Sequence, residues 1–136
     1  MNKKFFKLLW FGFPLSKLVY AYIAYMNIKE INNSLEMINL LFMFIGIITC
    51  FTSIIFSKKI FQDNFSENKI LKAFIGTKNA DELSTKFALY TMMLGLAETS
   101  ALFGLVQFII TGNLIAGAMM FGFCFIAWLF NYPSEV

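Results

Sequence analysis

The residue that raises the sharpest chemical question is Glu98, the single charged side chain in the stretch LGLAETSALFGLV, residues 94–106. If this stretch is a membrane helix that starts near Lys86, Glu98 lies about 18 Å along it, close to the middle of a ~30 Å hydrocarbon core. A charged side chain at that depth costs about 2.5 to 3.5 kcal/mol on insertion scales. We therefore expect Glu98 to be protonated, paired with a cationic side chain, or bound to a cation.

Hydroxyl side chains close to Glu98 in the sequence could complete an ion-binding site. Thr99 and Ser100 follow the carboxylate directly, and their hydroxyl oxygens could join it in holding a cation. The second apolar segment offers further hydroxyls, and we expect it to contribute to a small polar pocket between helices through Thr49, Thr52 or Ser53.

A lysine in the first apolar segment offers a structural explanation for the same carboxylate. If that segment starts at Leu8, Lys17 lies about 13 Å from the membrane surface, within about 5 Å of the depth of Glu98. Membrane-buried charges commonly pair with one another. A shift of the segment by one turn would instead let Lys17 reach the surface, so a pairing with Glu98 and a solvated lysine both stay open.

The composition indicates that these charges lie in a membrane protein. The chain has 136 residues, of which 59% are hydrophobic and 18% aromatic, and its mean hydropathy is +0.70. This is far too apolar for a water-soluble domain. We predict an all-α, single-domain protein with four transmembrane helices arranged as two antiparallel hairpins, the spans covering residues 8–28, 37–57, 87–110 and 114–130.

The distribution of lysines predicts the orientation of these spans. The N-terminal tail has three lysines and the connection from Lys58 to Lys86 has six, whereas the connection between the first two spans has only Lys29. Because cytoplasmic segments collect basic residues, both termini and the long connection are expected in the cytoplasm. The net charge of +3 is too small and too dispersed to indicate a nucleic-acid partner.

Small residues at helical spacing predict where the helices approach one another. Gly46 belongs to a small-residue stripe in the second span that continues through Cys50, Ser53 and Ser57. In the third span, pairs of small residues four apart favour close helix contact. We expect the packing residues there to be Gly95, Ala97, Ala101 and Gly104.

The 29-residue connection is long enough to carry structure of its own. Its apolar residues recur at near-helical spacing from Phe61 to Ile75, which predicts an amphipathic helix that either lies on the cytoplasmic headgroups or packs against the ends of the bundle. This segment is a candidate contact for anionic lipid or a protein partner. Asn79 is the expected N-cap of the third helix, which would then begin near residue 80.

The residues around Glu98 resemble the ion-carrying helix of rotary ATPase proteolipids, the c-type ring subunits. The matching residues are Ala97, Glu98, Ala101, Leu102, Phe103, Gly104, Leu105 and Val106. The resemblance covers about 20 residues of 136 and implies a carboxylate that takes up and releases an ion within a homo-oligomeric ring. Sodium-type members have a hydroxyl residue after the glutamate, matched by Thr99, and a tyrosine where this chain has Phe103, so the resemblance favours H⁺ over Na⁺.

The chain departs from that family in its partner helix, its long connection and the position of its carboxylate in the third helix. It also resembles small uncharacterised four-span bacterial membrane proteins that share the Glu-containing third helix and the Gly-Asn turn, which implies a location in the bacterial inner membrane. For those proteins the resemblance supplies no activity.

Two function classes follow from these patterns. The first is a proteolipid-like, self-associating membrane protein in which Glu98 binds H⁺. The second is a non-transporting membrane scaffold or accessory subunit in which Glu98 is structural.

An enzyme is not expected, because the chain has no histidine, no metal-ligand spacing and no phosphate-binding glycine loop. We expect no cofactor and no metal, and interpret Cys50 and Cys124 as small hydrophobic residues. A secretory signal peptide is not expected either, because Lys17 interrupts the first apolar run.

Overall fold

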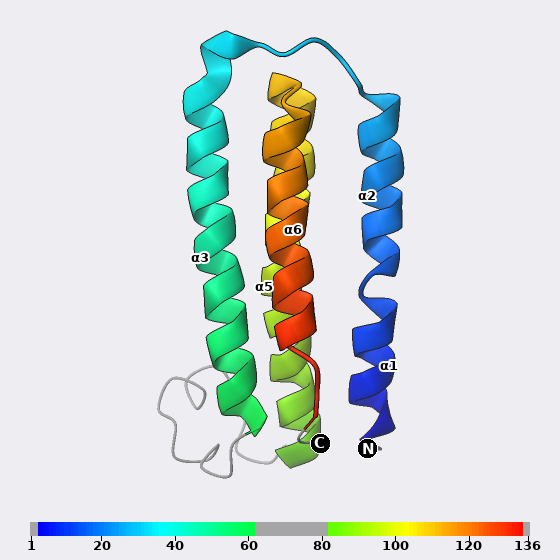
Figure 1. Ribbon diagram of the computed structural model, residues 1–136. Helices are drawn as coiled ribbons and strands as arrows, with labels where there is room; N and C mark the ends of the chain where they lie inside the picture. The colour runs from blue at the N-terminus through cyan, green and yellow to red at the C-terminus, as the bar shows by residue number, and fades with distance from the viewer. Residues whose placement is uncertain (1–2, 62–81, 135–136) are drawn as a thin grey trace.

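The computed structural model describes residues 3–61 and 82–134, and every regular element among them is helical. The elements are α1 (Lys4–Gly12), α2 (Leu15–Met26), the short 3₁₀ helix η1 (Asn33–Leu35), α3 (Glu36–Phe61), α5 (Glu82–Thr111) and α6 (Leu114–Phe130). They run roughly parallel to one long axis, with both ends of the chain at the same end of the bundle (Figure 1). The predicted all-α class is confirmed for the described residues.

Three helical segments are long and apolar enough to cross a membrane, namely Lys4–Met26, Asn33–Phe61 and Leu83–Thr111. The fourth apolar helix, α6, has 17 residues and the bounds expected for the last span. Helices α3 and α5 continue beyond the predicted spans, to Phe61 and back to Glu82, so the connection between them is shorter at both ends than the predicted 58–86. The expected amphipathic segment and the N-cap at Asn79 lie outside the described residues.

The surface of the bundle carries the large apolar residues, and the helix contacts use small ones. On α3 the buried stripe consists of Gly46, Cys50, Ser53 and Ser57, as the sequence predicted, together with Asn39 and Ile60. The exposed face of the same helix carries Met37, Leu40, Leu41, Phe44, Ile48, Phe51 and Ile55. This reverses the pattern of a water-soluble helix, and it fits a helix packed through small residues and surrounded by lipid.

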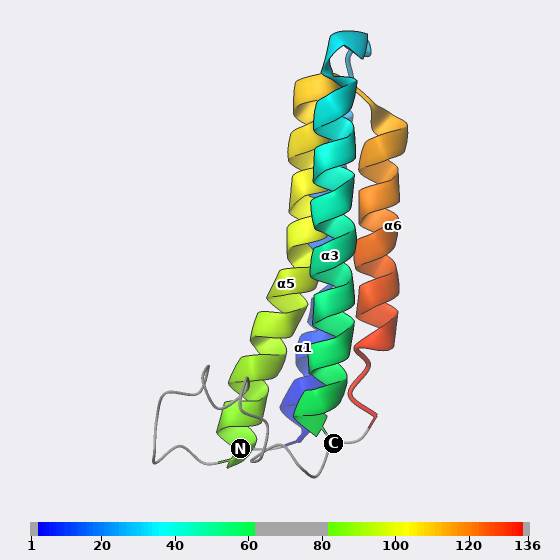
Figure 2. The same cartoon turned by 90° about the vertical axis from the view of Figure 1, so that its left-hand side faces the viewer.

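Helices α3, α5 and α6 form the core of the bundle. Figure 2 shows α3 in front of α5 and α6, and all three pairs are in contact. The crossing of α5 and α6 depends on glycine, because a Cβ at Gly104 would lie 2.9 Å from Met120 Cβ and 3.0 Å from the Gly117 carbonyl oxygen. A side chain at Gly46 would meet the Ser100 hydroxyl at 2.8 Å. These close approaches increase the van der Waals contact on which helix association in lipid depends.

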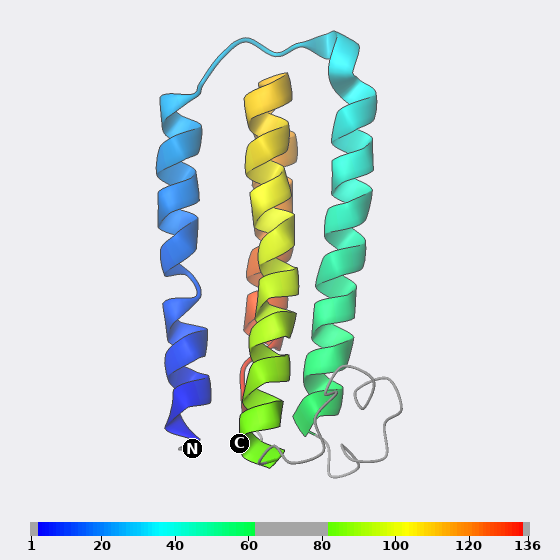
Figure 3. The same ribbon diagram turned by 180° about the vertical axis from the view of Figure 1, so that it is seen from behind.

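A two-residue turn, Gly112 and Asn113, joins α5 to α6 and reverses the chain (Figure 3). Gly112 has a φ of +72°, a left-handed conformation that glycine adopts without strain. Asn113 then caps α6, because its side-chain oxygen accepts a hydrogen bond from the Ala116 backbone N–H at 3.1 Å. The loop after α2 rests on this turn, with the Asn32 N–H donating to the Thr111 carbonyl at 2.8 Å.

The N-terminal segment, α1 followed by α2, packs on the outside of this core, and we call it the N-terminal arm. Its main contacts are with α5, whereas α2 itself has no buried residue. The predicted continuous first span is divided at Phe13 and Pro14, although both keep helical dihedrals, so α2 continues in the general direction of α1 (Figure 1). Proline divides the helix because it has no N–H to donate.

Residues of α1 attach the arm to the core at the end where the termini lie. Phe6 is completely buried and packs with Tyr90 and Leu94 of α5. Trp10 stacks on Trp128 of α6, with ring centroids 4.2 Å apart and planes inclined by 14°. The exposed outer face of α2 carries Leu18, Val19, Tyr22, Tyr25 and Met26. The arm is therefore anchored through buried aromatic residues in α1, whereas α2 has no buried residue.

Candidate functional site

Lys17 of α2 forms an ion pair with Glu98 of α5, through its ammonium Nζ and the carboxylate Oε2. Of the two possibilities that the sequence left open for Lys17, the structure has the pairing. The side chains are partly covered, with exposed fractions of 20% for Lys17 and 21% for Glu98. This ion pair joins the arm to the helix core.

The interruption at Pro14 creates the polar surroundings of the Lys17 ammonium. The Phe13 carbonyl oxygen accepts from the Ser16 hydroxyl at 3.0 Å and from Lys17 Nζ at 3.4 Å. The ammonium also lies 2.9 Å from Ser16 Oγ. With Glu98, three oxygen atoms thus surround the charge, which matches the three N–H donors of an ammonium group. These contacts offset part of the cost of placing a polar group in partly covered surroundings.

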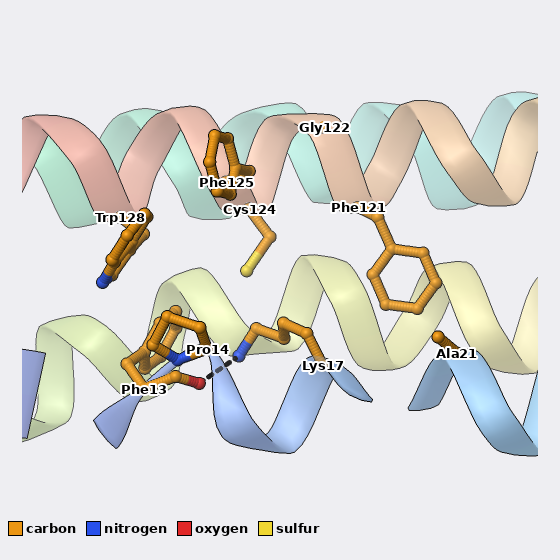
Figure 4. Close-up of a pocket in the computed structure, with 9 residues that line it drawn as sticks. All are labelled: Phe13, Pro14, Lys17, Ala21, Phe121, Gly122, Cys124, Phe125 and Trp128. Atoms are coloured by element: carbon orange, nitrogen blue, oxygen red, sulfur yellow. Dashed lines mark hydrogen bonds between the residues drawn. The ribbon is translucent and has the colours of Figure 1, made fainter. Parts of the chain in front are cut away.

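Aromatic rings and a thiol complete the site. Lys17 Nζ lies 3.5 Å from the centroid of the Phe13 ring and 5.9 Å from that of Tyr20, distances typical of cation–π contact. The Tyr20 side chain also lies close to Glu98. Figure 4 shows the Cys124 sulfur on α6 facing the side of the arm that carries Lys17.

Two cavities open on either side of the ion pair. One of about 370 Å³ lies between the arm and α6, and Lys17, Cys124 and Trp128 are among its lining residues (Figure 4). The other, of about 470 Å³, lies between the arm and α5, and Glu98 and Ser16 contribute to its wall. The remaining lining residues of both cavities are mainly apolar. The carboxylate is therefore reachable from the outer surface of the bundle without displacement of the helix core.

The hydroxyl residues predicted to join Glu98 bond elsewhere. Thr99 Oγ1 donates to the Gly95 carbonyl at 3.1 Å within its own helix, and Ser100 Oγ donates to the Met120 carbonyl at 3.1 Å on α6. Neither hydroxyl forms a hydrogen bond with Glu98 in this structure, and the ion-binding set of Glu98, Thr99 and Ser100 stays a prediction. Successive residues of a helix point about 100° apart, so Glu98 turns toward α2 while Ser100 turns toward α6.

Helix α3, which corresponds to the predicted second span, does not contribute to the site either. Thr49 donates to the Gly46 carbonyl at 3.0 Å and Thr52 to the Ile48 carbonyl at 2.8 Å, both within α3. Ser53 donates to the Met93 carbonyl at 2.6 Å on α5. Helix α3 packs against the face of α5 that carries Ala97, whereas Glu98 pairs with Lys17 of α2, so the hydrogen bonds of these hydroxyls do not involve Glu98.

Most of the predicted packing residues lie in helix contacts, with one exception. Ala97 and Ala101 are completely buried, and Gly46 and Gly104 lie where helices approach closely. Gly95 is exposed, and a Cβ there would meet no atom within 4 Å. Its assignment to the packing set is corrected, because two helical residues before Ala97 correspond to a rotation of about 200°, which turns Gly95 to the opposite face.

Several members of the site were missed at the level of sequence. Ser16, Tyr20 and Cys124 were not associated with Glu98, although Ser16 and Tyr20 flank Lys17 at offsets of one and three residues. The offset of three places Tyr20 on the same helix face as Lys17.

The described residues contain no group of three or more histidine, cysteine, aspartate or glutamate side chains that could hold a metal ion. Comparison of the chain with protein-family models, with curated proteins and with solved structures gives no match.

Proposed function

We propose that this chain is an integral membrane protein with four membrane-crossing segments, in which the Lys17–Glu98 ion pair fastens the N-terminal arm to a three-helix core. In this proposal the protein acts as a non-transporting scaffold or accessory subunit, and Glu98 has a structural role. The observation that carries it is the ion pair itself, since the Lys17 ammonium occupies the position at the carboxylate that a transported cation would need.

The charge distribution supports the proposed orientation. Both described ends of the chain and the ends of α3 and α5 that lead to residues 62–81 lie at one end of the bundle (Figure 1). Lys58, Lys59 and Lys86 lie at that end together with the three N-terminal lysines, whereas Lys29 lies at the other. By the positive-inside rule this end faces the cytoplasm, in agreement with an inner-membrane protein whose termini are both cytoplasmic.

The short last helix is compatible with a fourth crossing. Helix α6 has no charged residue, and its 17 residues extend about 26 Å, slightly less than a ~30 Å hydrocarbon core. Local thinning of the bilayer or interfacial anchoring compensates for a mismatch of this size at modest cost. Trp128 and Tyr132, which lie near its C-terminal end, are residue types that favour the interface.

The second candidate function is the proteolipid-like one, in which Glu98 exchanges H⁺ in a homo-oligomer. The observation that favours it is the exposure of the carboxylate at the wall of the cavity between the arm and α5. In that case Lys17 would act as a displaceable counter-ion, and Glu98 would take up H⁺ when the arm moves away.

Labelling with a hydrophobic carbodiimide in lipid separates the two functions, because this reagent reacts with protonated carboxyl groups in apolar surroundings. The structural role predicts no labelling of Glu98 in the wild-type chain and clear labelling in Lys17→Met. Lys29→Met is the matched control, since Lys29 bonds the Ile110 carbonyl at the opposite end of the bundle. Wild-type labelling that falls as the pH rises, with no effect of Lys17→Met, would support H⁺ exchange instead.

A further inference from the structure

A polar pocket and an apolar groove meet on the face of the bundle opposite the Lys17–Glu98 pair, between α3 and α6. The groove has a volume of about 500 Å³, and Ile47, Phe51, Ile54 and Ile126 are among the apolar residues that line it. The pocket has a volume of about 260 Å³. Lys58 and Phe130 line both, so the two form one continuous surface depression.

The pocket contains buried polar atoms that lack hydrogen-bond partners. Ser57 and Asn131 are 2% and 1% exposed, and among the described residues neither Ser57 Oγ nor Asn131 Oδ1 has a partner. Leaving such groups unsatisfied is costly in an apolar medium. Ser57 can donate a hydrogen bond and Asn131 Oδ1 can only accept one, so a matching ligand offers both an acceptor and a donor.

Two hydrogen bonds of Asn131 fix the orientation of its side-chain oxygen, Oδ1. The Asn131 amide Nδ2 donates to Ser53 Oγ at 2.8 Å, and the Asn131 carbonyl accepts from the Tyr90 hydroxyl at 2.6 Å. The amide therefore cannot turn to satisfy its oxygen without breaking the bond to Ser53. Lys58 adds a positive charge at the pocket rim, with its ammonium 5.7 Å from the centroid of the Phe130 ring.

From these features we infer that the depression between α3 and α6 binds a phospholipid with an anionic, hydroxyl-bearing headgroup, of which phosphatidylglycerol is the simplest example. The phosphate accepts from Lys58 and Ser57, and a headgroup hydroxyl donates to Asn131 Oδ1. One acyl chain lies in the groove. From Lys58 to Ile47 the groove follows 11 residues of α3, about 16 Å, which is close to the depth of one leaflet.

The charge of the membrane leaflet next to the pocket agrees with an anionic phospholipid as the ligand. In the proposed orientation the pocket faces the cytoplasmic leaflet, which is the anionic one. The inferred lipid site rests on the proposed function only in the choice of the cytoplasmic leaflet. Nanodiscs present the same lipids on both faces, so binding measured in them tests the lipid site independently of the orientation and of the role of Glu98.

The test measures phosphatidylglycerol bound to the full-length chain by native mass spectrometry, after titration against a phosphatidylcholine background. We expect the wild type to retain one phosphatidylglycerol in preference to phosphatidylcholine. Lys58→Gln lowers the affinity about five-fold, the effect of one lysine near a charged membrane surface. The matched control is Lys59→Gln, since Lys59 follows Lys58 on the same helix but lies over Phe56 and outside the pocket.

A second variant removes the risk that lost binding reflects lost folding. Ser57→Ala deletes a hydroxyl that has no partner among the described residues, so the fold loses no hydrogen bond, whereas phosphatidylglycerol affinity falls about two- to ten-fold. Equal affinity in the wild type, Lys58→Gln and Lys59→Gln would overturn the inference. Displacement of the lipid by soluble glycerophosphoglycerol at a similar concentration would also overturn it, because the site would then bind a free phosphate ester and the groove would contribute nothing.

Discussion

The carbonyl oxygen of Trp10 accepts the indole N–H of Trp128 at 2.9 Å, and the indole N–H of Trp10 donates in return to the Trp128 carbonyl at 2.7 Å. Both carbonyls lie where the regular helical bonding is interrupted. Residue 14, which would normally donate to the Trp10 carbonyl, is proline, and Trp128 lies in the last turn of α6, where its carbonyl also accepts from the Asn131 backbone N–H at 3.2 Å. We call this reciprocal pair the tryptophan clasp.

The tryptophan clasp predicts that α1 detaches from α6 when one indole N–H is removed. Trp128→Phe loses one donor and part of the stacked ring, and leaves the Trp10 carbonyl unpaired, so we expect a loss of about 1 to 3 kcal/mol in the free energy of unfolding. Titration of the protein with SDS in mixed micelles measures this loss. The control is Trp128→Phe in a Pro14→Ala background, where residue 14 regains an N–H for the Trp10 carbonyl. A loss as large in that background would contradict the role assigned to Pro14.

The ion pair predicts non-additive effects of its two partners. Lys17→Met leaves Glu98 without its counter-ion, and we expect a loss of about 2 kcal/mol, smaller than the ~3 to 5 kcal/mol of a fully buried pair because both side chains are about one-fifth exposed. Adding Glu98→Gln to Lys17→Met restores most of the loss, since no isolated charge remains. The same SDS titration over the four proteins of this double-mutant cycle gives the coupling energy. Additive losses would contradict a direct pair.

The sequence predicted the parts of this fold that depend on composition and helix periodicity. Long apolar segments indicated membrane helices, and the small-residue stripe through Gly46, Cys50 and Ser53 correctly indicated the buried face of α3. These features are local, so a single sequence contains them in full.

The contents of the site were harder to predict, because they depend on how each helix is rotated against its neighbours. Glu98, Thr99 and Ser100 are adjacent in sequence but point toward different helices, so adjacency did not predict a shared ligand cluster. The pairing of Lys17 depended on the depth of the first span, which a difference of one turn would change by about 5 Å. The contact of Trp10 with Trp128 spans 118 residues and has no periodic signal in the sequence.

Glycines at two positions of α5 predict opposite responses to the same substitution. Gly104→Ala introduces a Cβ 2.9 Å from Met120 Cβ and 3.0 Å from the Gly117 carbonyl oxygen, so α6 must shift and we expect a loss of about 1 to 3 kcal/mol. Gly95→Ala meets nothing within 4 Å and gains helix propensity, up to about 1 kcal/mol. Unfolding of the two variants under identical conditions tests both. A destabilised Gly95→Ala would indicate a neighbouring chain at that face, as expected for self-association.

A buried polar cluster lies at the end of the bundle opposite the chain termini. We expect the loss of one amide side chain from this cluster to lower the free energy of unfolding substantially. Gln107 Nε2 donates to Asn39 Oδ1 and to Thr111 Oγ1, the latter at 2.8 Å, and Thr111 Oγ1 also donates to Asn39 Oδ1 at 3.1 Å. Asn39→Ala removes the acceptor that these groups share between α3 and α5. We expect a loss of about 1 to 3 kcal/mol, because the Gln107 amide keeps fewer partners while it stays fully buried.

The matched control for Asn39 is Asn27→Ala. Asn27 Nδ2 donates to the Ile23 carbonyl at 2.7 Å at an exposed position, where water or headgroups replace the lost bond, so we expect a change within about 0.5 kcal/mol. Hydrogen exchange of the backbone amides near residue 111 gives an independent readout. Asn39→Ala should speed exchange there, since Thr111 anchors both the turn before α6 and the loop after α2. Unchanged exchange, with stability equal to that of Asn27→Ala, would show that the cluster does not hold these elements together.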